Sequence, residues 1–246
     1  MTSSDNGGPG NSARSAPGWR HRHSDVSGGW LRPTVFGAMD GLVTNASLIV
    51  GVGGGGLSPH AIVLTGLAGL AAGSFSMAAG EYISVTSQNQ LIQAEATVER
   101  GKLERFPDAE EEELTEMLTG YGLDLDLASQ VAAEMSTRPE AALRMHTLEE
   151  FGVNPEELPS PWVAAALSMV SFALGAIIPL LPYLAGATSL VASVVLTAIA
   201  LFAGGAVVGR LTSRPLLRCG FRQLALGTLA AAVTYGIGQA ISALSP

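Results

Sequence analysis

Long apolar stretches alternate with one long polar stretch along this chain. Residues 41–80, 162–209 and 223–246 contain no Asp, Glu, Lys or Arg. A helix needs roughly 20 apolar residues to cross a bilayer, so the first two stretches are each long enough for two crossings and the last for one. Backbone groups in lipid must be hydrogen-bonded within the protein, which makes helices the expected spanning structure. We therefore predict an all-α polytopic membrane protein with five transmembrane helices, near 32–53, 60–87, 161–182, 187–209 and 220–243.

The composition supports this class of protein. Hydrophobic residues make up 48% of the chain and the mean hydropathy is +0.35. A soluble bundle of buried helices is the alternative, but uncharged blocks of this length with turn signals inside them are hard to fit into one core. The single cysteine, Cys219, excludes an internal disulfide framework. Residues 1–29 are rich in Gly, Ser, Pro, Arg and His without an apolar run, which predicts a disordered tail and not a signal peptide.

Arginine placement predicts the orientation in the membrane. Arginines precede the first helix and bracket the turn at 210–222, whereas the loops near 54–60 and 183–188 carry no Lys or Arg. Because basic residues favour the cytosolic side, we expect the N-terminus, this turn and the polar middle of the chain in the cytosol, and the C-terminus on the opposite side. We expect the cell membrane rather than a vacuolar membrane. The arginines concerned are Arg14, Arg20, Arg22, Arg32, Arg210, Arg214, Arg218 and Arg222.

The polar middle is strongly acidic. Residues 81–160 hold 18 of the 21 acidic residues and only five basic ones. We predict that the second membrane helix continues out of the bilayer until Pro107 stops it. Three further helices should follow, over 108–122, 124–136 and 139–152. The expected organisation is a tail (1–29), two membrane helices (30–89), a cytosolic acidic helical insert (90–159) and three membrane helices (160–246).

Several acids in the insert could gather into a cation site. Glu110 and Glu113 share a helix face because they lie three residues apart. Glu99 lies on the preceding helix, and Glu149 and Glu150 lie near the end of the last one. A divalent cation would neutralise such a group. A solvated acidic face is the alternative, and spacing alone favours it.

Acidic and polar residues also occur inside two membrane helices. In "GSFSMAAGEYISVTSQ", residues 73–88, one polar stripe runs along a helix whose other faces are apolar. In the first helix, Asp40 is the single charge of "FGAMDGLVTNASLIVG", with Thr44 and Ser47 roughly above it and Asn45 on a neighbouring face. The stripe consists of Ser74, Met77, Glu81, Ser84 and Gln88.

Neither helix core offers a Lys or Arg to pair with Asp40 or Glu81, so these acids need a proton or a metal cation. A thioether such as that of Met77 adds affinity for transition metals such as Fe(II) over Mg or Ca. Core packing is the alternative for Met77, and a place at the cytosolic interface is the alternative for Glu81. The residues that we expect along a transport pathway are Asp40, Thr44, Asn45, Met77, Glu81 and Ser84.

Three motifs in the membrane helices are similar to those of a known family. "DGLVTNASLIVGVGGG", "GSFSMAAGEYISVTSQ" and "GAIIPLLPY" resemble the vacuolar iron transporter family, over about residues 31–244. The resemblance implies a homodimer of five-helix protomers with a pore at the dimer axis, moving Fe(II) or Mn(II) out of the cytosol in exchange for protons. It also implies that Asp40 and Met77 are metal-site residues of the pore, and that the insert is the family's metal-binding domain.

The insert departs from the family pattern at Lys102, where the family has Glu, and in the family's last element, Met-Glu-x-x-Glu, at His146 and Thr147. The first Glu-x-x-Glu pair reads Glu99-Arg-Gly-Lys102, so a lysine replaces its second carboxylate, whereas Glu110 and Glu113 preserve the second pair. The last element reads His146-Thr147-Leu148-Glu149-Glu150, with Glu150 in register. His146 could be a substitute ligand, and Met145 or Glu149 a displaced one. The resemblance therefore implies an insert ligand set of Glu99, Glu110, Glu113, His146 and Glu150.

Two functions from different classes follow. The first is a secondary transporter that exports Fe(II) or Mn(II) against protons, with metal ions, protons, the lipid bilayer and a second copy of the chain as partners. The second is a non-transporting membrane protein that senses or sequesters metal through the insert. No nucleotide loop, Ser-His-Asp arrangement or zinc-ligand spacing is present, so we expect no enzyme, no tightly bound cofactor and no nucleic-acid partner.

Overall fold

In the computed structural model, residues 30–244 are described, and no strand occurs among them. Within this range, five segments are long and apolar enough to cross a membrane, which confirms the predicted fold class. The predicted tail, with Arg14, Arg20 and Arg22, lies outside the described residues. The five segments are α1 (Leu31–Gly54), α2 (Pro59–Arg105), α6 with its continuation (Pro161–Leu184), α8 (Leu190–Leu211) and α9 (Leu216–Leu244).

Helix α1 is packed against α6 through glycines. A Cβ atom at Gly41 would lie 2.1 Å from the carbonyl oxygen of Phe172, and one at Gly175 would lie 2.1 Å from the carbonyl oxygen of Ala38. Only glycine allows two backbones to approach this closely, as in many membrane bundles. The contact fixes the position of α1, which carries Asp40, against the rest of the bundle.

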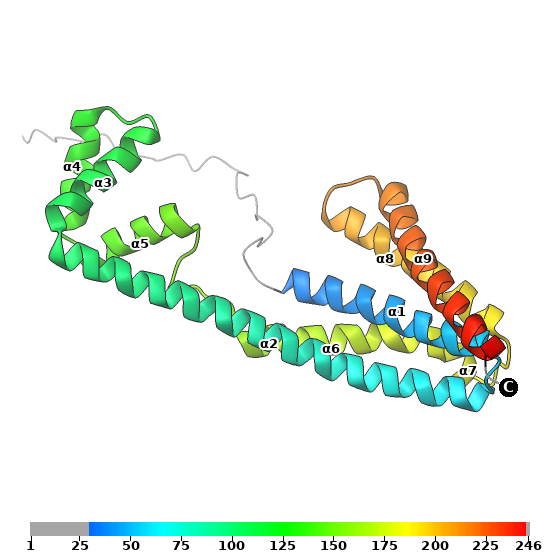
Figure 1. The fold of residues 1–246 in the computed structure, drawn as a ribbon. Helices are drawn as coiled ribbons and strands as arrows, with labels where there is room; N and C mark the ends of the chain where they lie inside the picture. The colour runs from blue at the N-terminus through cyan, green and yellow to red at the C-terminus, as the bar shows by residue number, and fades with distance from the viewer. Residues whose placement is uncertain (1–29, 245–246) are drawn as a thin grey trace, which may run out of the picture.

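Helix α2 runs from the membrane bundle into the insert without a break for 47 residues (Figure 1). Its start is set by Ser58, whose hydroxyl accepts a hydrogen bond from the Ala61 amide (3.3 Å), and by Pro59 in the first turn. Its end comes at Arg105, because Phe106 leaves the helical conformation before Pro107. The predicted continuation of the second membrane helix as far as Pro107 is confirmed.

The insert contains three short helices, α3 (Pro107–Gly120), α4 (Leu125–Ser136) and α5 (Pro139–Phe151). Leu114 and Leu118 of α3 pack against Ala128 and Ala132 of α4 in a small apolar core. Helix α5 returns along α2, where Arg100 donates two hydrogen bonds to the Glu140 carboxylate (2.9 and 3.1 Å). This arrangement brings α2, α3 and α5 together at one place.

The third membrane segment is interrupted near its end. Helix α6 (Pro161–Ile177) passes into a 3₁₀ turn, η1 (Ile178–Leu180), and then into one turn of helix, α7 (Leu181–Leu184). Pro179 and Pro182 lack backbone N–H groups, so they cannot continue a regular helix. The hydroxyl of Ser193 on α8 donates to the Pro179 carbonyl (2.6 Å), which satisfies a backbone group at the interruption.

Two helix starts differ from the predicted positions. Helix α8 begins at Leu190 and not near 187, because the Ser189 side chain caps it by accepting from the Val191 amide (3.3 Å). Helix α9 begins at Leu216 and not near 220, directly after Pro215. The turn between them is therefore shorter than expected.

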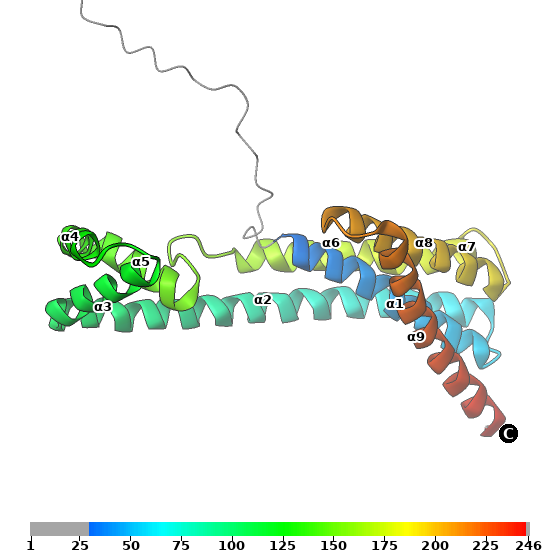
Figure 2. The same ribbon diagram turned by 90° about the horizontal axis from the view of Figure 1, so that it is seen from above.

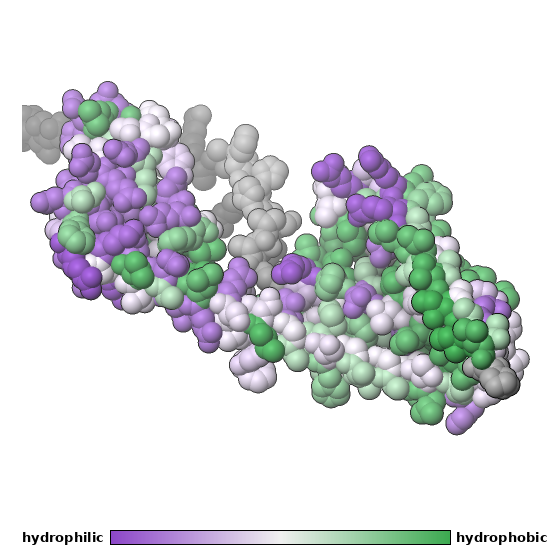
Figure 3. Space-filling model, viewed as in Figure 1, coloured by the Kyte–Doolittle hydropathy of each residue, from purple (hydrophilic) through white to green (hydrophobic). Residues whose placement is uncertain are grey.

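The helix ends and connections lie at two opposite ends of the membrane bundle. The starts of α1 and α6 and the α8–α9 turn lie toward the insert, and the α1–α2 and α7–α8 connections lie at the far end (Figures 1 and 2). Figure 3 shows hydrophilic residues gathered over the insert and hydrophobic ones over the bundle. Near the insert-facing end, the rings of Tyr82 and Trp162 are in contact, with centroids 4.7 Å apart and planes tilted by 52°. Trp and Tyr are enriched at membrane interfaces.

Candidate metal sites

Asp40 and Thr44 lie one turn apart on α1 and interact with each other. The Thr44 hydroxyl donates to Asp40 Oδ1 (3.3 Å), and both residues are half-buried. The hydrogen bond orients the carboxylate and leaves its second oxygen available for a further partner.

Asp40 and Glu81 reach the same cleft from two different helices. This cleft, of about 820 Å³, opens near the insert-facing helix ends, since the first residues of α1 and Pro159 also line it. Arg32 and Arg222 contribute to the same lining. Among the described residues, neither acid forms an ion pair with them. The sequence shows these arginines at helix ends but does not show which helices meet there.

The other predicted pathway residues lie apart from this cleft. Asn45 is fully buried, and its Nδ2 donates to the carbonyl oxygen of Ala176 (2.5 Å), just before the 3₁₀ turn. Met77 is half-buried and Ser84 is exposed on α2, and neither lines the cleft. Within one chain, the structure therefore brings together Asp40, Thr44 and Glu81, and leaves Asn45, Met77 and Ser84 elsewhere.

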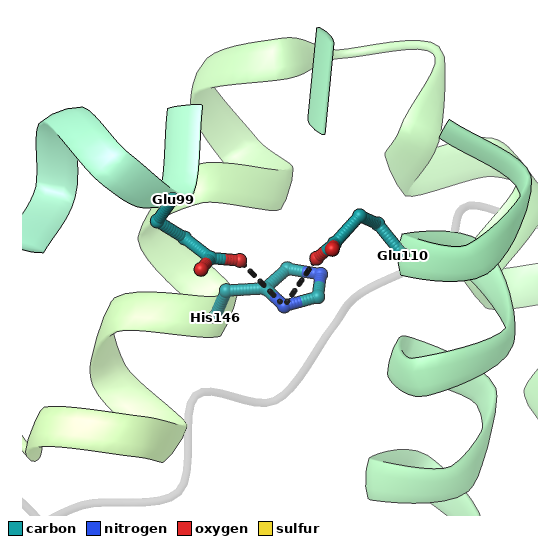
Figure 4. Close-up of side chains that lie close together, drawn as sticks. All are labelled: Glu99, Glu110 and His146. Carbon is teal, nitrogen blue, oxygen red and sulfur yellow. Dashed lines mark ion pairs between the residues drawn. The ribbon is translucent and has the colours of Figure 1, made fainter. Parts of the chain in front are cut away.

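A second cluster lies in the insert, where three helices meet. Glu99 of α2, Glu110 of α3 and His146 of α5 point toward one another (Figure 4). His146 Nδ1 lies 3.3 Å from Glu99 Oε1 and 3.8 Å from Glu110 Oε2. One ligand atom from each residue falls within 4.8 Å of the others, so a single ion could bind all three after small side-chain adjustments.

The cluster is buried, and several of its polar atoms form no hydrogen bond. Glu99, Glu110 and His146 are 1%, 6% and 0% exposed. In the part of the chain that the structure describes, neither His146 nitrogen makes a hydrogen bond, and the same holds for Glu99 Oε1 and Glu110 Oε2. Three of these atoms, His146 Nδ1, Glu99 Oε1 and Glu110 Oε2, lie within ion-pair distance of one another. Buried polar groups almost always have partners, and either a proton on His146 or a bound cation would satisfy them.

The electrostatics of the cluster point the same way. Burial and the negative charge of Glu99 raise the pKa of Glu110 to about 7, from its ordinary value of 4.5. Burial and the charge of Glu99 also raise the pKa of Glu150. A divalent cation would relieve this repulsion and favour the ionised form of both groups.

The remaining acids of the insert surround this cluster at different distances. Glu113 is half-buried, and its charge contributes to the raised pKa of both Glu110 and Glu150. Glu150 connects to the cluster through Lys102, whose Nζ lies 2.8 Å from Glu99 Oε2 and 3.9 Å from Glu150 Oε1. The structure therefore adds Lys102, which the sequence showed only as a missing acid, to the residues that shape the site.

Both alternative ligands near His146 have other roles. Met145 packs against the apolar core formed by α3 and α4. Glu149 accepts a short hydrogen bond from the Tyr121 hydroxyl. Of the residues considered at the end of α5, His146 is the one whose side chain enters the cluster.

Two carboxylates and an imidazole form a mixed oxygen and nitrogen ligand set. Imidazole suits iron, zinc, nickel and copper, whereas magnesium and calcium favour all-oxygen sites. The residues present thus fit a divalent transition metal better than an alkaline-earth ion.

Comparison with known proteins gives a consistent match along the chain. The VIT family profile matches residues 31–239. Vacuolar iron transporter 2 of Oryza sativa subsp. japonica is 31% identical over 89% of this chain and 90% of its own length. The vacuolar iron transporter of Acanthamoeba castellanii is 34% identical, over 90% of this chain and 82% of its own length. Vacuolar iron transporter 1 of Arabidopsis thaliana is 29% identical, over 88% of both chains.

Proposed function

This chain belongs to the VIT family, and from that premise we propose that it transports Fe(II) and/or Mn(II) out of the cytosol in exchange for protons. The named relatives support iron as the cargo, since each is called a vacuolar iron transporter and matches almost the whole chain. The proposal treats the metal as substrate and not as a resident cofactor.

The observation that carries the proposal is the cleft shared by Asp40 and Glu81. Acidic groups at membrane depth are costly unless they face a pathway or a partner. Two carboxylates from different helices around one water-accessible cleft can bind a divalent ion when ionised and release it on taking up protons. Exchange of one cation for protons at the same groups is the simplest chemistry for this arrangement.

The insert supplies the ion in this proposal. Its cluster of Glu99, Glu110 and His146, with Glu113 and Glu150 close by, binds metal on the cytosolic side, at the same end of the bundle as the cleft. The N-terminus, insert and α8–α9 turn face the cytosol, as the arginines at these ends favour. We propose the cell membrane as the location; the word vacuolar belongs to the names of the relatives.

A second copy of the chain completes the pathway. Met77 and Ser84 lie outside the cleft of a single chain. These two residues of α2 can border a route if two copies place their α2 helices around a shared axis, whereas Asn45 stays buried against α6. A homodimer with the pore at this axis meets that requirement.

Metal uptake into sealed proteoliposomes tests the proposal. Fe(II) should accumulate inside vesicles that contain the protein. Accumulation should rise when the lumen is more acidic than the outside medium, because protons leaving the lumen then drive metal entry. Asp40→Asn keeps the shape of the side chain but removes its charge, so it should reduce uptake to the level of empty vesicles while the protein still inserts. Wild-type uptake by Asp40→Asn would contradict the role of the cleft.

A sequestering or sensing function is the second candidate, and the buried insert cluster is the observation that favours it. The same vesicles separate the two. Metal bound to the protein without accumulation in the lumen, at any proton gradient, would support sequestration and contradict transport.

A further inference from the structure

Lys102 lies where a cation would lie, between two acids of the insert. Its ammonium is 2.8 Å from Glu99 Oε2 and 3.9 Å from Glu150 Oε1. The other oxygen of Glu99, Oε1, faces His146 at 3.3 Å. One carboxylate oxygen of Glu99 therefore contacts the Lys102 ammonium, and the other faces the buried cluster with His146 and Glu110.

From this division we propose that the insert binds one divalent transition-metal ion, through Glu99, Glu110 and His146, and that Lys102 occupies the place of a second ion. The proposal rests on the insert being a metal site, as proposed above, and specifies how many ions it takes. His146 adds a second observation for the first position, because its imidazole is fully buried, its Nδ1 faces the two acids, and its Nε2 is hydrogen-bonded to no described residue.

Charge balance limits the site to one ion. Four carboxylates contribute to the local field: Glu99, Glu110, Glu113 and Glu150. One ammonium and one divalent ion leave a single negative charge, which a partly exposed site tolerates easily. A second divalent ion beside the ammonium would reverse the sign and place like charges close together, which is unfavourable at short range.

The chain itself suggests the change that would admit a second ion. In Lys102→Glu, a carboxylate would replace the ammonium beside Glu99 and Glu150, giving an all-oxygen position next to the first site. In Lys102→Gln, the charge disappears without a new strong ligand. The first change should alter the number of bound ions and the second only their affinity.

Co(II) binding to the full-length protein in detergent, with Asp40→Asn in every sample to remove the membrane site, tests the proposal. The protein that keeps Lys102 should bind one Co(II) per chain, and His146→Ala should abolish that binding. Lys102→Gln should bind one ion on the order of tenfold more tightly, because a nearby positive charge is gone. Lys102→Glu should bind two. Arg105→Gln removes a positive charge one turn further along α2 and should change affinity by less than about threefold.

Each other outcome overturns the proposal. Binding of two ions by the protein that keeps Lys102, or of one ion by Lys102→Glu, would show that the lysine does not occupy the position of a second ion. If Lys102→Glu does not fold, the test rests on Lys102→Gln. An unchanged Co(II) affinity in Lys102→Gln would show that Lys102 forms only a surface ion pair and would overturn the proposal. Absence of Co(II) from the insert in every variant would overturn this proposal and the metal-binding role of the insert. Uptake into vesicles is measured separately and would stand or fall on its own.

Discussion

Met77 offers a thioether on the membrane half of α2, where its side chain is half-buried and lies outside the cleft of a single chain. If it is a pore ligand, Met77→Leu should reduce Fe(II) uptake severalfold and Mn(II) uptake less, because leucine keeps the volume but removes the soft sulfur. Initial uptake rates for both metals in the same vesicles measure this difference. Met169→Leu on α6, also at a half-buried position, is the matched control and should transport both metals normally. Equal losses for the two metals in Met77→Leu would indicate packing.

Glu110 makes the stability of the metal-free protein depend on pH. Its pKa is raised from 4.5 to about 7 in the folded state, so the folded protein holds a proton that the unfolded chain has lost. The stabilisation is complete below pH 4.5 and is lost as pH rises toward 7. The unfolding temperature in chelator should therefore fall as pH is raised from about 5 to 7. This decrease should be smaller in Glu110→Gln, which cannot titrate.

Glu112→Gln is the control for this measurement, because Glu112 is an exposed neighbour on the same helix. It should keep the pH dependence of the unchanged protein. An equal slope for Glu110→Gln and Glu112→Gln would place the titrating group elsewhere. Addition of Co(II) at pH 7 should raise the unfolding temperature of the unchanged protein, since a ligand that binds only the folded state stabilises it.

At the scale of the helices, the contact between α1 and α6 depends on Gly175. A single added methyl group would meet the Ala38 carbonyl at 2.1 Å, and two backbones cannot both give way without moving the helices apart. Gly175→Ala should cost about 1–3 kcal/mol or more and lower the unfolding temperature by several degrees. Thermal unfolding in detergent measures the change.

Gly101→Ala provides the comparison for Gly175→Ala. Gly101 lies in the middle of α2, and a Cβ atom there would have no neighbour within 4 Å among the described residues. Alanine favours a helix over glycine by up to about 1 kcal/mol, so this variant should be equally or more stable. A loss of stability in both variants would mean that glycine is needed for its flexibility and not for the close approach.

The helices themselves were largely predictable, for reasons local to the chain. Uncharged runs of bilayer length predict the membrane segments, and Pro107 and Gly152 mark helix ends where the structure has them. The 3₁₀ turn at Ile178–Leu180 was missed, although Pro179 and Pro182 signal it. For the insert site, the family resemblance named Glu99, Glu110 and His146 among five expected ligands, but not which of the five come together. Glu99 and His146 are far apart in sequence, and their meeting depends on how α5 returns along α2, which no short-range pattern encodes.

At the scale of the whole molecule, the positions of the residues proposed for the pathway lead us to expect a dimer. Asp40 and Glu81 line a cleft that Met77 and Ser84 do not reach, which is why we propose two copies. Light scattering of the solubilised protein should give a protein mass of two 25.2 kDa chains. A mass of one chain, in detergent that preserves metal uptake after reconstitution, would contradict the shared pathway.

Helix α2 joins the membrane to the insert as a single rod. Glu81 and Glu99 are eighteen residues apart on it, which is five helical turns, so they lie on the same side of the helix about 27 Å from each other. Because the helix is continuous, a tilt at its membrane end displaces its far end. A tilt of about five degrees around Glu81 would carry Glu99 sideways by about 2 Å, enough to open or tighten a three-ligand site. If the insert binds an ion as proposed, its affinity for that ion would depend on the angle at which α2 stands in the bilayer.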